Sequence, residues 1–377
     1  MTLLRSIARV QLLLAVLSAV TASASTDAPS AIDADATVHS PALAIPFSSL
    51  SSTEQEKFFM NYFAHDSSCE LDGREHDIND IRRELDDCLR VGIAKLRATF
   101  PVDIKPRGIA GVQTDVIEPA GGIVARNKRR VLINLHGGGF MVGGGLGGQM
   151  ESIPIAALSA IKVICVDYRE GPEHKFPTAS EDVAAVYQEL LKSYPAKNIG
   201  IYGCSAGGVL TAESVAWFQT HGLPRPGAIG IFGAGALLPI AGDSNYLGPV
   251  LTGGRGPIDA TWSYRSTKPE SDAKKIMPYF DVPELIIKDP LVSPAYFPSV
   301  LAKFPPSLII SGTRDFELSP AVYTHSQLVK QGINADLHVW EGATHCAFGQ
   351  PVADASVPET REAWDVTVKF FDKNLGK

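Results

Sequence analysis

From residue 131 onward, this chain alternates between short apolar runs and longer segments with helical periodicity. Strands are predicted near residues 131–135, 162–167, 199–202, 228–232, 307–311 and 336–340. Helices are predicted near 149–160, 178–193, 206–221, 320–331 and 360–373, and a further strand-like stretch covers 108–119. Strands that alternate with helices form a mostly parallel sheet with helices on both faces. The sequence therefore predicts an α/β fold, and we find no internal repeat.

Two segments lie outside this alternation. Residues 79–100 place apolar side chains at helical intervals and are predicted to form one amphipathic helix. The second segment, about 240–298, is dense in proline and glycine and contains Trp262, Tyr264, Met277, Tyr279 and Phe280. A long insertion between two core strands must emerge at one end of the sheet. We therefore expect it to cover that end, and the alternative is a surface loop without a function.

A serine stands where one predicted strand meets the following helix. The strand ends at Tyr202, and the next five residues are Gly203-Cys204-Ser205-Ala206-Gly207. Small neighbours let the helix begin close to the strand, so that the Ser205 hydroxyl is exposed at the carboxyl end of the sheet. The start of the helix adds unpaired N–H groups and a partial positive charge. The pattern predicts a nucleophilic serine, although Gly-x-Ser-x-Gly alone also occurs by chance in turns.

A second strand, Val131 to Leu135, runs directly into His136-Gly137-Gly138-Gly139-Phe140. Glycines let several backbone N–H groups point into one concave spot, which suits a developing oxyanion. A flexible loop is one alternative, because more glycines follow between residues 143 and 148. A phosphate cradle is another, but the run lacks the Gly-Lys-Ser/Thr ending of a P-loop and the context of a dinucleotide site. We expect an oxyanion site beside Ser205.

A serine nucleophile needs a base, which in such folds follows the serine in the chain. Three histidines lie late enough. His325 falls within a helical stretch and is expected at the surface, and His338 alternates with apolar residues on a strand face. His345 follows that strand in the loop Glu341-Gly342-Ala343-Thr344-His345. His345 is therefore predicted to be the base.

The base needs an orienting carboxylate, which is expected between the serine and the histidine. Asp315 stands just beyond the predicted strand at 307–311, ahead of a helix that Ser319-Pro320 could start. An aspartate in this place could instead cap a helix or stabilise a turn. Asp315 is the predicted acid, and Glu317 on the same loop is the second candidate.

Taken together, these motifs resemble the hormone-sensitive lipase family of the α/β-hydrolases. The resemblance rests on His136 to Phe140, on Asp167 to Pro177, and on the serine motif with the additional glycine Gly208. It implies an α/β-hydrolase fold, with a mostly parallel sheet, helices on both faces and a mainly helical cap. The implied organisation is a core over 105–377 and a cap formed by residues 51–104 and the insertion at about 240–298.

The resemblance also implies roles for single residues and no cofactor. Ser205 would be the nucleophile, Asp315 the acid and His345 the base, while the backbone N–H groups of Gly138, Gly139 and Ala206 would form the oxyanion hole. His136, Asp167 and Arg169 would hold loops rather than react. The nine histidines and five cysteines show no zinc-ligand spacing, and this chemistry needs no metal.

Three positions depart from the family's usual pattern. The residue before the serine is usually acidic and here is Cys204. The residue after the histidine is usually glycine or a small apolar residue and here is Cys346. Glu170-Gly171 replaces the Leu-Ala expected before a proline, which alters packing there. None of these changes removes a catalytic atom.

The first 24 residues have the composition of a secretory signal peptide. Arg5 and Arg9 precede an apolar run over 12–20, and Ala22-Ser23-Ala24 is a small-residue cleavage site. We expect cleavage after Ala24, secretion or a periplasmic location, and a soluble mature protein, with an uncleaved N-terminal anchor as the alternative. Residues 25–50, rich in Ala, Ser, Asp and Pro, are predicted to be a mobile leader.

The charge balance argues against nucleic-acid and anionic-lipid partners. Residues 1–24 carry two of the 34 basic residues and none of the 41 acidic ones, so the remainder has a net charge of −9. Negatively charged phosphates would be repelled by such a chain. The sequence does not indicate an oligomeric state.

Five cysteines in an exported chain leave at least one unpaired. Cys69 and Cys88 are the first predicted pair, because both fall in the N-terminal cap region; Cys88 could instead be a buried helix residue. Cys204 and Cys346 should approach each other if Ser205 and His345 do, but proximity alone is not bonding geometry. Cys165, inside a predicted strand, is expected to be a free and inert thiol.

The predicted activity is hydrolysis of short- to medium-chain carboxylic esters through an acyl-enzyme. A lactone or arylacetamide-type amide is the alternative substrate, although amides demand better-tuned protonation of the leaving group. The alternative from another class is a non-catalytic small-molecule binding protein on a hydrolase scaffold.

Overall fold

The computed structural model describes residues 44–63, 77–238, 242–252, 279–280, 289–349 and 353–376, with two short strands before them. The chain divides into two units, residues 1–47 and 48–377. In the first unit, β1 (Ala31–Ile32) pairs antiparallel with β2 (Val38–His39). The predicted signal peptide and most of the predicted leader lie outside the described residues, so both stay predictions.

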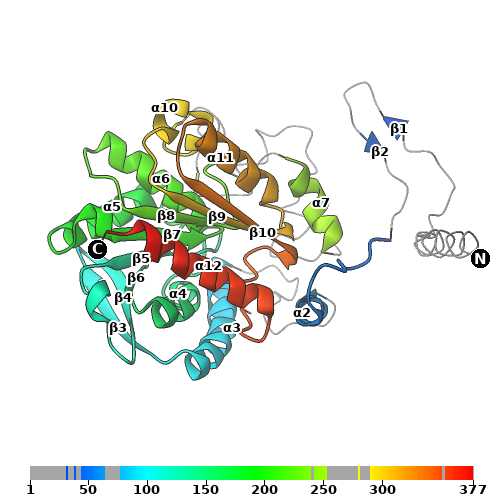
Figure 1. Cartoon of the computed structure of the whole chain (residues 1–377), viewed down its shortest axis with the longest axis horizontal. Coiled ribbons are helices and arrows are strands. Elements are labelled where there is room, and N and C mark those ends of the chain that lie inside the picture. The colour runs from blue at the N-terminus through cyan, green and yellow to red at the C-terminus, as the bar shows by residue number, and fades with distance from the viewer. Residues whose placement is uncertain are drawn as a thin grey trace, which may run out of the picture. The chain divides into compact units, whose positions relative to one another are not determined.

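The second unit is built on one eight-stranded sheet (Figure 1). Its order is β10-β9-β8-β7-β5-β6-β4-β3. The strands are β3 (Val102–Ile109), β4 (Val112–Pro119), β5 (Val131–Leu135), β6 (Lys162–Val166), β7 (Ile199–Cys204), β8 (Ala228–Phe232), β9 (Ser307–Arg314) and β10 (Ala335–Thr344). All neighbouring strands are parallel except for the pairs that β4 makes. The predicted α/β fold with a mostly parallel sheet is confirmed.

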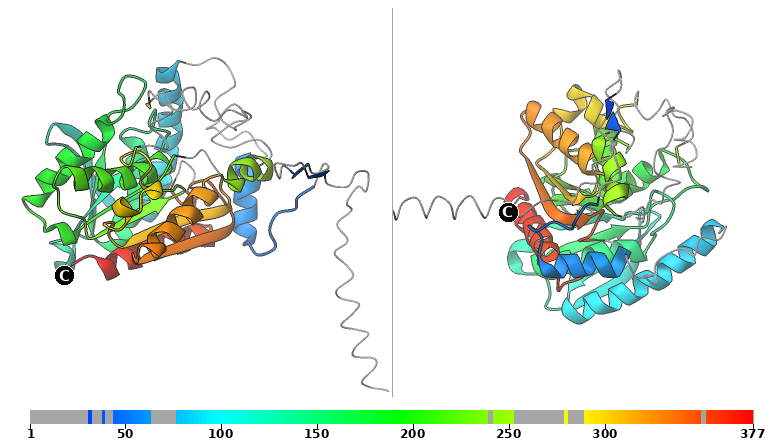
Figure 2. Two further views of the ribbon diagram at one scale, coloured as in Figure 1. Left: turned by 90° about the horizontal axis from the view of Figure 1, so that it is seen from above. Right: turned by 90° about the vertical axis from the view of Figure 1, so that its right-hand side faces the viewer.

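Helices cover both faces of this sheet (Figure 2). The core helices are α3 (Ile78–Thr99), α4 (Leu146–Ser159), α5 (Thr178–Leu191), α6 (Ala206–Thr220), α11 (Leu318–Lys330) and α12 (Pro358–Asn374). Side chains along β5 alternate between two cores: Ile133 packs with residues of α5, α6 and α11, and Leu132 packs with residues of α3, α4 and α12. A strand buried on both sides needs mainly apolar residues, which explains the apolar run that marked β5 in the sequence; its one polar residue, the buried Asn134, donates to Glu151.

The structure corrects the N-terminal edge of the predicted sheet. The stretch predicted over 108–119 as a single strand contains the end of β3, a turn and the whole of β4, and β3 pairs with β4 along its full length in an antiparallel hairpin. The turn is formed by Ala110 and Gly111, whose φ angles of 51° and 86° are left-handed. Glycine in this position is the usual signal of a hairpin turn.

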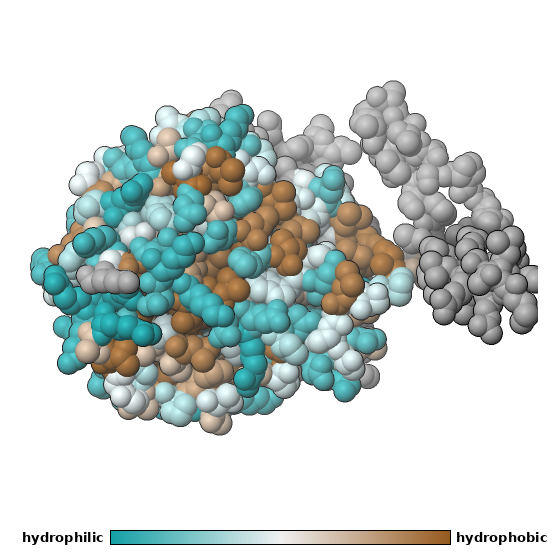
Figure 3. All heavy atoms as spheres, viewed as in Figure 1, coloured by the Kyte–Doolittle hydropathy of each residue, from teal (hydrophilic) through white to brown (hydrophobic). Residues whose placement is uncertain are grey.

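Shorter elements connect or cover the core. They are α2 (Thr53–Phe63), α7 (Asp243–Leu251), α10 (Pro298–Leu301) and the 3₁₀ turns η1 (Ala125–Asn127), η2 (Ala196–Asn198) and η3 (Pro294–Tyr296). Apolar side chains gather at the surface over α7 and α11 (Figure 3), including the exposed Tyr246, Leu247 and Val250 of α7. Within the described residues, no helix is both long and apolar enough to cross a bilayer.

Helix α6 starts unusually close to the middle strands of the sheet. A Cβ atom on Gly207 would overlap the backbone oxygen of Leu135, and one on Gly203 would overlap the same atom. Only glycine leaves room for the helix to begin directly at the end of β7. This contact fixes Ser205 at the carboxyl edge of the sheet.

We predict that Gly207→Ala destabilises the fold by at least about 3 kcal/mol, the upper end of typical overpacking costs. The clash involves backbone atoms, which cannot turn aside as a flexible side chain would. The control is Gly108→Ala, because a Cβ atom there would meet nothing within 4 Å and the φ angle is ordinary. Urea unfolding monitored by circular dichroism measures both. Equal midpoints for the two variants would contradict the close approach.

Candidate active site

Ser205 occupies the sharp turn between β7 and α6. Its φ of 57° and ψ of −125° lie outside the ordinary helical and strand regions, a strained conformation that is typical of a nucleophile held on a strand-to-helix turn. The Ser205 N–H donates to the carbonyl of Phe232 on neighbouring β8 at 2.8 Å. The turn is therefore tied to the sheet, and the hydroxyl projects from its carboxyl edge.

Strands β9 and β10 bring the predicted acid and base together. Both run further than the sequence predicted, with an irregularity in β10 between Trp340 and Thr344, and the last residues in register are Arg314 and Thr344. Asp315 directly follows β9 and His345 directly follows β10. The two side chains therefore leave the sheet side by side. His345 Nδ1 lies 2.8 Å from Asp315 Oδ1.

The same imidazole reaches the serine. His345 Nε2 lies 2.9 Å from Ser205 Oγ. A carboxylate only accepts hydrogen bonds, so Nδ1 carries the proton toward Asp315 and Nε2 accepts from the serine hydroxyl. The side chain of Asp315 is fully buried, and that of His345 is only 8% exposed. The three residues singled out in the sequence form one continuous line of hydrogen bonds.

Glu317, the second candidate for the acid, takes a different role. Its backbone N–H donates to Asp315 Oδ1 at 2.9 Å, and the Ser311 hydroxyl donates to Oδ2 at 3.0 Å. The Glu317 side chain is buried, and its Oε2 has no hydrogen-bond partner. Burial first, and then the charge of Asp315, raise the pKa of Glu317 well above its usual range. The geometry therefore assigns the contact with His345 to Asp315.

The other late histidines lie away from the serine. His325 sits on α11, where its Nε2 is 3.2 Å from the Ala335 carbonyl oxygen. His338 lies on β10, with its ring against that of Trp340. Among the described residues, no group of three or more His, Cys, Asp or Glu side chains could hold a metal ion.

The glycine loop after β5 and the first residue of α6 carry unpaired N–H groups at the carboxyl ends of neighbouring strands. Within the described residues, the N–H groups of Gly138, Gly139 and Ala206 donate to no protein acceptor. Gly138 has a φ of 118°, and a Cβ atom there would overlap the backbone oxygen of Val142. The loop conformation thus depends on glycine. Three donors left without a protein partner are what an oxyanion site requires.

A buried glutamate that the sequence analysis did not single out holds the start of this loop. Glu151 of α4 accepts from the side chain of Asn134 at 2.8 Å and from the N–H of Gly137 at 3.0 Å. It is the only charged residue of α4, which is the signal that could have revealed it. Its carboxylate anchors the loop to the end of β5.

His136 is buried beneath the loop and does not face the serine. Its ring stacks on Tyr168 at a centroid distance of 4.1 Å, and the Tyr168 hydroxyl donates to the His136 carbonyl at 2.7 Å. Burial lowers the pKa of His136 to about 4, so the ring is neutral at pH 7. This position agrees with the loop-holding role that the resemblance implied.

Two aromatic residues of the insertion pack against the tip of the loop. Phe140 stacks on Tyr279 at 4.9 Å between centroids and meets Phe280 edge-on at 5.3 Å. Tyr279 and Phe280 are buried, so they support the loop rather than line an open pocket. The other aromatic residues expected in the cap, Trp262 and Tyr264, lie outside the described residues.

Arg82 of α3 fastens the outer side of the loop. Its guanidinium donates to the carbonyls of Met141 and Gly171 at 3.0 and 2.8 Å, and to the exposed Glu173. The half-buried Glu170 carboxylate lies 3.6 Å from the Arg82 Nε. Helix α3 was predicted as part of the cap. Its apolar face packs on α4, and Arg82 holds the loops of Met141 and Gly171.

Elements α7 and α2 pack around the acid loop. The Ser244 hydroxyl of α7 donates to the carbonyl of Phe316 at 2.6 Å, and the Phe316 ring lies 4.2 Å from that of His345. Arg314 donates to the Leu251 carbonyl at 2.6 Å and covers the ring of Phe59 on α2. The described parts of the predicted cap regions thus contact the loop that carries Asp315.

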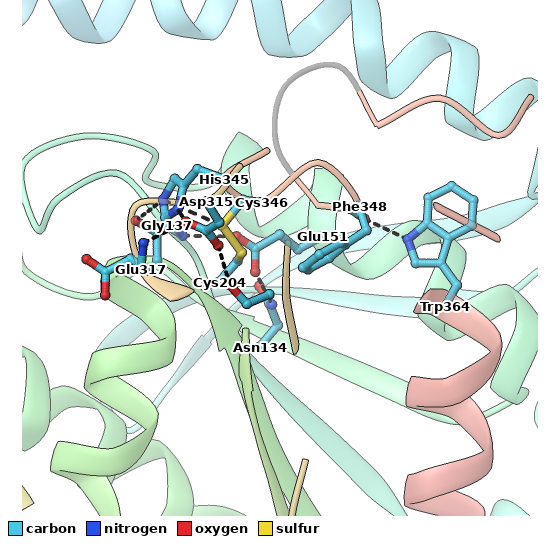
Figure 4. The surroundings of a disulfide bond; sticks show 12 residues. Asn134, Gly137, Glu151, Cys204, Asp315, Glu317, His345, Cys346, Phe348 and Trp364 are labelled. Atoms are coloured by element: carbon cyan, nitrogen blue, oxygen red, sulfur yellow. Dashed lines mark hydrogen bonds and ion pairs between the residues drawn. A yellow bond between two sulfur atoms is a disulfide. The ribbon is translucent and has the colours of Figure 1, made fainter. Parts of the chain in front are cut away.

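One of the two cysteine pairs predicted from the sequence is formed by described residues. Cys204 and Cys346, the second predicted pair, form a disulfide next to His345 and Asp315 (Figure 4). Cys88 is also disulfide-bonded; its predicted partner, Cys69, lies outside the described residues, so that pairing stays a prediction. Cys165 is free and buried, as expected, and burial raises the pKa of its thiol.

We predict that Glu170→Gln makes the free energy of unfolding less dependent on pH. Burial raises the pKa of Glu170 from 4.5 to about 7, and the charge of Arg82 only partly opposes this. Between these values the folded chain binds more protons than the unfolded chain, so the free energy of unfolding falls as pH rises. The variant lacks this titration. As the pH rises from 4 to 8, the free energy of unfolding of the variant should increase by on the order of 3 kcal/mol relative to that of the native protein.

Glu173→Gln is the matched control, because Glu173 contacts the same arginine from the surface. Its hydrogen bond with Arg82 lowers the pKa of Glu173. Its ionised form therefore favours the folded state, and the variant should lose stability relative to the native protein as pH rises. Denaturant unfolding at several pH values measures both differences. A pH-independent effect of Glu170→Gln would show that this carboxyl does not titrate as described.

The comparisons with known proteins agree with this geometry. The alpha/beta hydrolase fold family profile matches residues 132–349. The crystal structure of esterase E25 superimposes with a TM-score of 0.71 at 27% identity, over 90% of this chain and 99% of that one. An esterase of the bacterial hormone-sensitive lipase family has the same fold, with a TM-score of 0.66 at 23% identity over 86% of this chain and 99% of that one.

Three relatives are similar in sequence. A protein of Mycobacterium tuberculosis, provisionally named an acetyl-hydrolase, is 32% identical over 38% of this chain and 49% of its own length. The acetyl-hydrolase of Streptomyces hygroscopicus is 27% identical over 67% of this chain and 79% of its own length. An esterase of Acinetobacter venetianus is 32% identical over 32% of this chain and 39% of its own length. The chain thus spans about half or less of two of these relatives.

The family profile covers more than half of the chain, and it includes the loop after β5, the serine turn and both strand ends that carry the acid and the base. The motifs over 136–140 and 203–208 lie at the edge of the sheet where the fold places its reactive groups. The chain belongs to the α/β-hydrolase family, and its motifs resemble those of the hormone-sensitive lipase family.

Proposed function

We propose that the protein is a serine carboxylic ester hydrolase that works through an acyl-enzyme. The observation that carries this proposal is the line from Ser205 Oγ through the His345 imidazole to Asp315, with contacts of 2.9 and 2.8 Å. A hydroxyl, an imidazole and a buried carboxylate in this order are the parts of a serine-hydrolase triad. The names of the relatives, acetyl-hydrolase and esterase, support the same class of reaction.

In the first half of the reaction, Ser205 Oγ attacks the ester carbonyl carbon while His345 Nε2 takes its proton. The imidazolium that forms is stabilised by Asp315, which accepts from Nδ1. The carbonyl oxygen becomes an oxyanion and accepts hydrogen bonds from the N–H groups of Gly138, Gly139 and Ala206. His345 then gives its proton to the leaving alcohol, and the acyl group remains on Ser205.

In the second half, water replaces the alcohol. His345 takes a proton from the water, the hydroxide attacks the acyl carbon, and a second oxyanion forms in the same position. When this intermediate collapses, His345 returns the proton to Ser205 Oγ and the carboxylic acid leaves. No step requires a metal or a cofactor.

The proposed substrates are esters with short to medium acyl chains. The described cap elements support this proposal, because α2, α7 and the segment with Tyr279 pack tightly around the loops of the site. Each additional methylene gains only about 0.8 kcal/mol of burial, and only until the pocket ends. A lactone or an arylacetamide-type amide is the second candidate substrate. Secretion or a periplasmic location is part of the same proposal and rests on residues 1–24.

We predict that the purified protein hydrolyses p-nitrophenyl acetate and butyrate faster than the palmitate ester, a lactone or an acetanilide. Ser205→Ala should lower kcat by on the order of 10³-fold or more, because the nucleophile is lost while buried contacts remain. Release of p-nitrophenol, followed by absorbance, measures both. A folded Ser205→Ala variant with native activity would show that Ser205 is not the nucleophile. Rates that keep rising toward long acyl chains would contradict the proposed acyl preference.

A second prediction separates the two acidic residues of one loop. Asp315→Asn should lower kcat by about 10³- to 10⁴-fold, because an amide cannot hold the imidazole in the required tautomer. Glu317→Gln should change kcat by less than about tenfold, because the carboxylate that contacts His345 is that of Asp315 and burial already disfavours the charged form of Glu317. Steady-state kinetics with p-nitrophenyl butyrate provides the comparison. The reverse order of the two effects would move the acid to Glu317.

A further inference from the structure

The Cys204–Cys346 disulfide joins the neighbours of the two groups that exchange a proton. Cys204 directly precedes Ser205, and Cys346 directly follows His345. The two Cα atoms are 6.2 Å apart, across a sequence separation of 142 residues. Because Asp315 lies between them in the chain, one covalent ring contains all three members of the proposed triad. The two cysteines are also two of the three positions at which the sequence departs from the family it resembles.

The bridge lies beneath the triad rather than at the surface. Both cysteines are buried, with exposures of 1% and 0%. Gly233, at the end of β8, supports the bridge: a Cβ atom there would lie 2.8 Å from Cys346 Sγ and 3.2 Å from Cys204 Sγ. The same hypothetical atom would lie 3.4 Å from Asp315 Oδ2. The disulfide thus fills the space between the sheet backbone and the carboxylate (Figure 4).

The backbone on both sides of the bridge is held in uncommon conformations. Ser205 has a φ of 57° and Cys346 a φ of 50°, and neither is a glycine. Such conformations persist only where surrounding bonds fix them. β10 ends at Thr344, and its last ladder pair with β9 is Thr344 with Arg314, so His345 lies just beyond the ladder. The disulfide is the covalent link between the end of β7 and the residue that follows the base.

We propose that this disulfide is a positioning element of the ester hydrolysis proposed above, on which it rests. It holds His345 Nε2 at hydrogen-bond distance from Ser205 Oγ, and the reduced protein turns over more slowly because the two loops can separate. A dithiol reductant reduces this disulfide. The S–S bond breaks, each cysteine gains one proton and one electron, and the reductant closes to its cyclic disulfide. A displacement of about 1 Å between reacting groups costs on the order of 10²-fold in rate.

The first test compares kcat for the native protein and the double variant Cys204→Ala/Cys346→Ala. Active sites are counted with a fluorophosphonate, and turnover is measured with p-nitrophenyl butyrate. We expect kcat per site to fall about 10²-fold while KM changes less than about threefold. The two single variants should equal the double variant, because each breaks the same bond. A double variant with native kcat would overturn the proposal.

Two controls distinguish positioning from stability. Cys165→Ala removes the buried free thiol, and Cys88→Ala removes a different disulfide, on the helix that packs against α4. Both should keep kcat within about threefold of the native value, even where the thermal midpoint falls. A bridge that serves only stability would lower the thermal midpoint of the double variant and leave its kcat at the level of these controls.

The second test uses the native protein and does not depend on folding of the variants. The protein is incubated with dithiothreitol, portions are alkylated, and peptide mass spectrometry gives the labelled fraction of Cys204 and Cys346. Activity should fall in proportion to that fraction and return after reoxidation. Full labelling of both cysteines with unchanged kcat would overturn the proposal. An oxidised native protein with no esterase activity would instead refute the proposed function itself.

Discussion

The pairing of β5 with β7 is the constraint on which the rest of the site depends. Leu135 and Gly203 are in register at the carboxyl ends of these two parallel strands. One strand then continues into the glycine loop and the other into Ser205, so the oxyanion donors and the nucleophile leave the sheet at adjacent points. The missing side chains of Gly203 and Gly207 allow α6 to approach Leu135. Without that approach, neither group would have a fixed position relative to the other.

The site concentrates conformations and buried groups that do not favour folding. Three of the five left-handed non-glycine residues among those described, Phe140, Ser205 and Cys346, lie at the site. Burial also raises the pKa values of nearby carboxyls, Glu170 and Glu317, above their usual range. Arg82, Glu151, the disulfide and the aromatic contacts of Tyr279 compensate by holding the loops in place. Stability elsewhere in the sheet supports this local strain.

The reactive residues were predictable because their signals are local. Short, mainly apolar runs mark β5 and β8, which the structure confirms, and small residues mark the turn at Ser205. Asp315 and His345 could be found because each follows a strand in the required order. The supports were less visible, since Arg82 is one of many charged residues on its helix, and only burial distinguishes it. The disulfide could not be assigned from spacing, because bond formation depends on three-dimensional geometry over 142 residues.

The most direct test of Ser205 as the nucleophile is to find which residue carries the acyl group during turnover. The protein is mixed with p-nitrophenyl butyrate, quenched in acid within the first turnovers, digested and analysed by peptide mass spectrometry. If Ser205 is the nucleophile, a single butyryl group appears on the peptide that contains Ser205 and is lost as water completes the reaction. Acylation of another residue, or complete hydrolysis with Ser205 never modified, would contradict it.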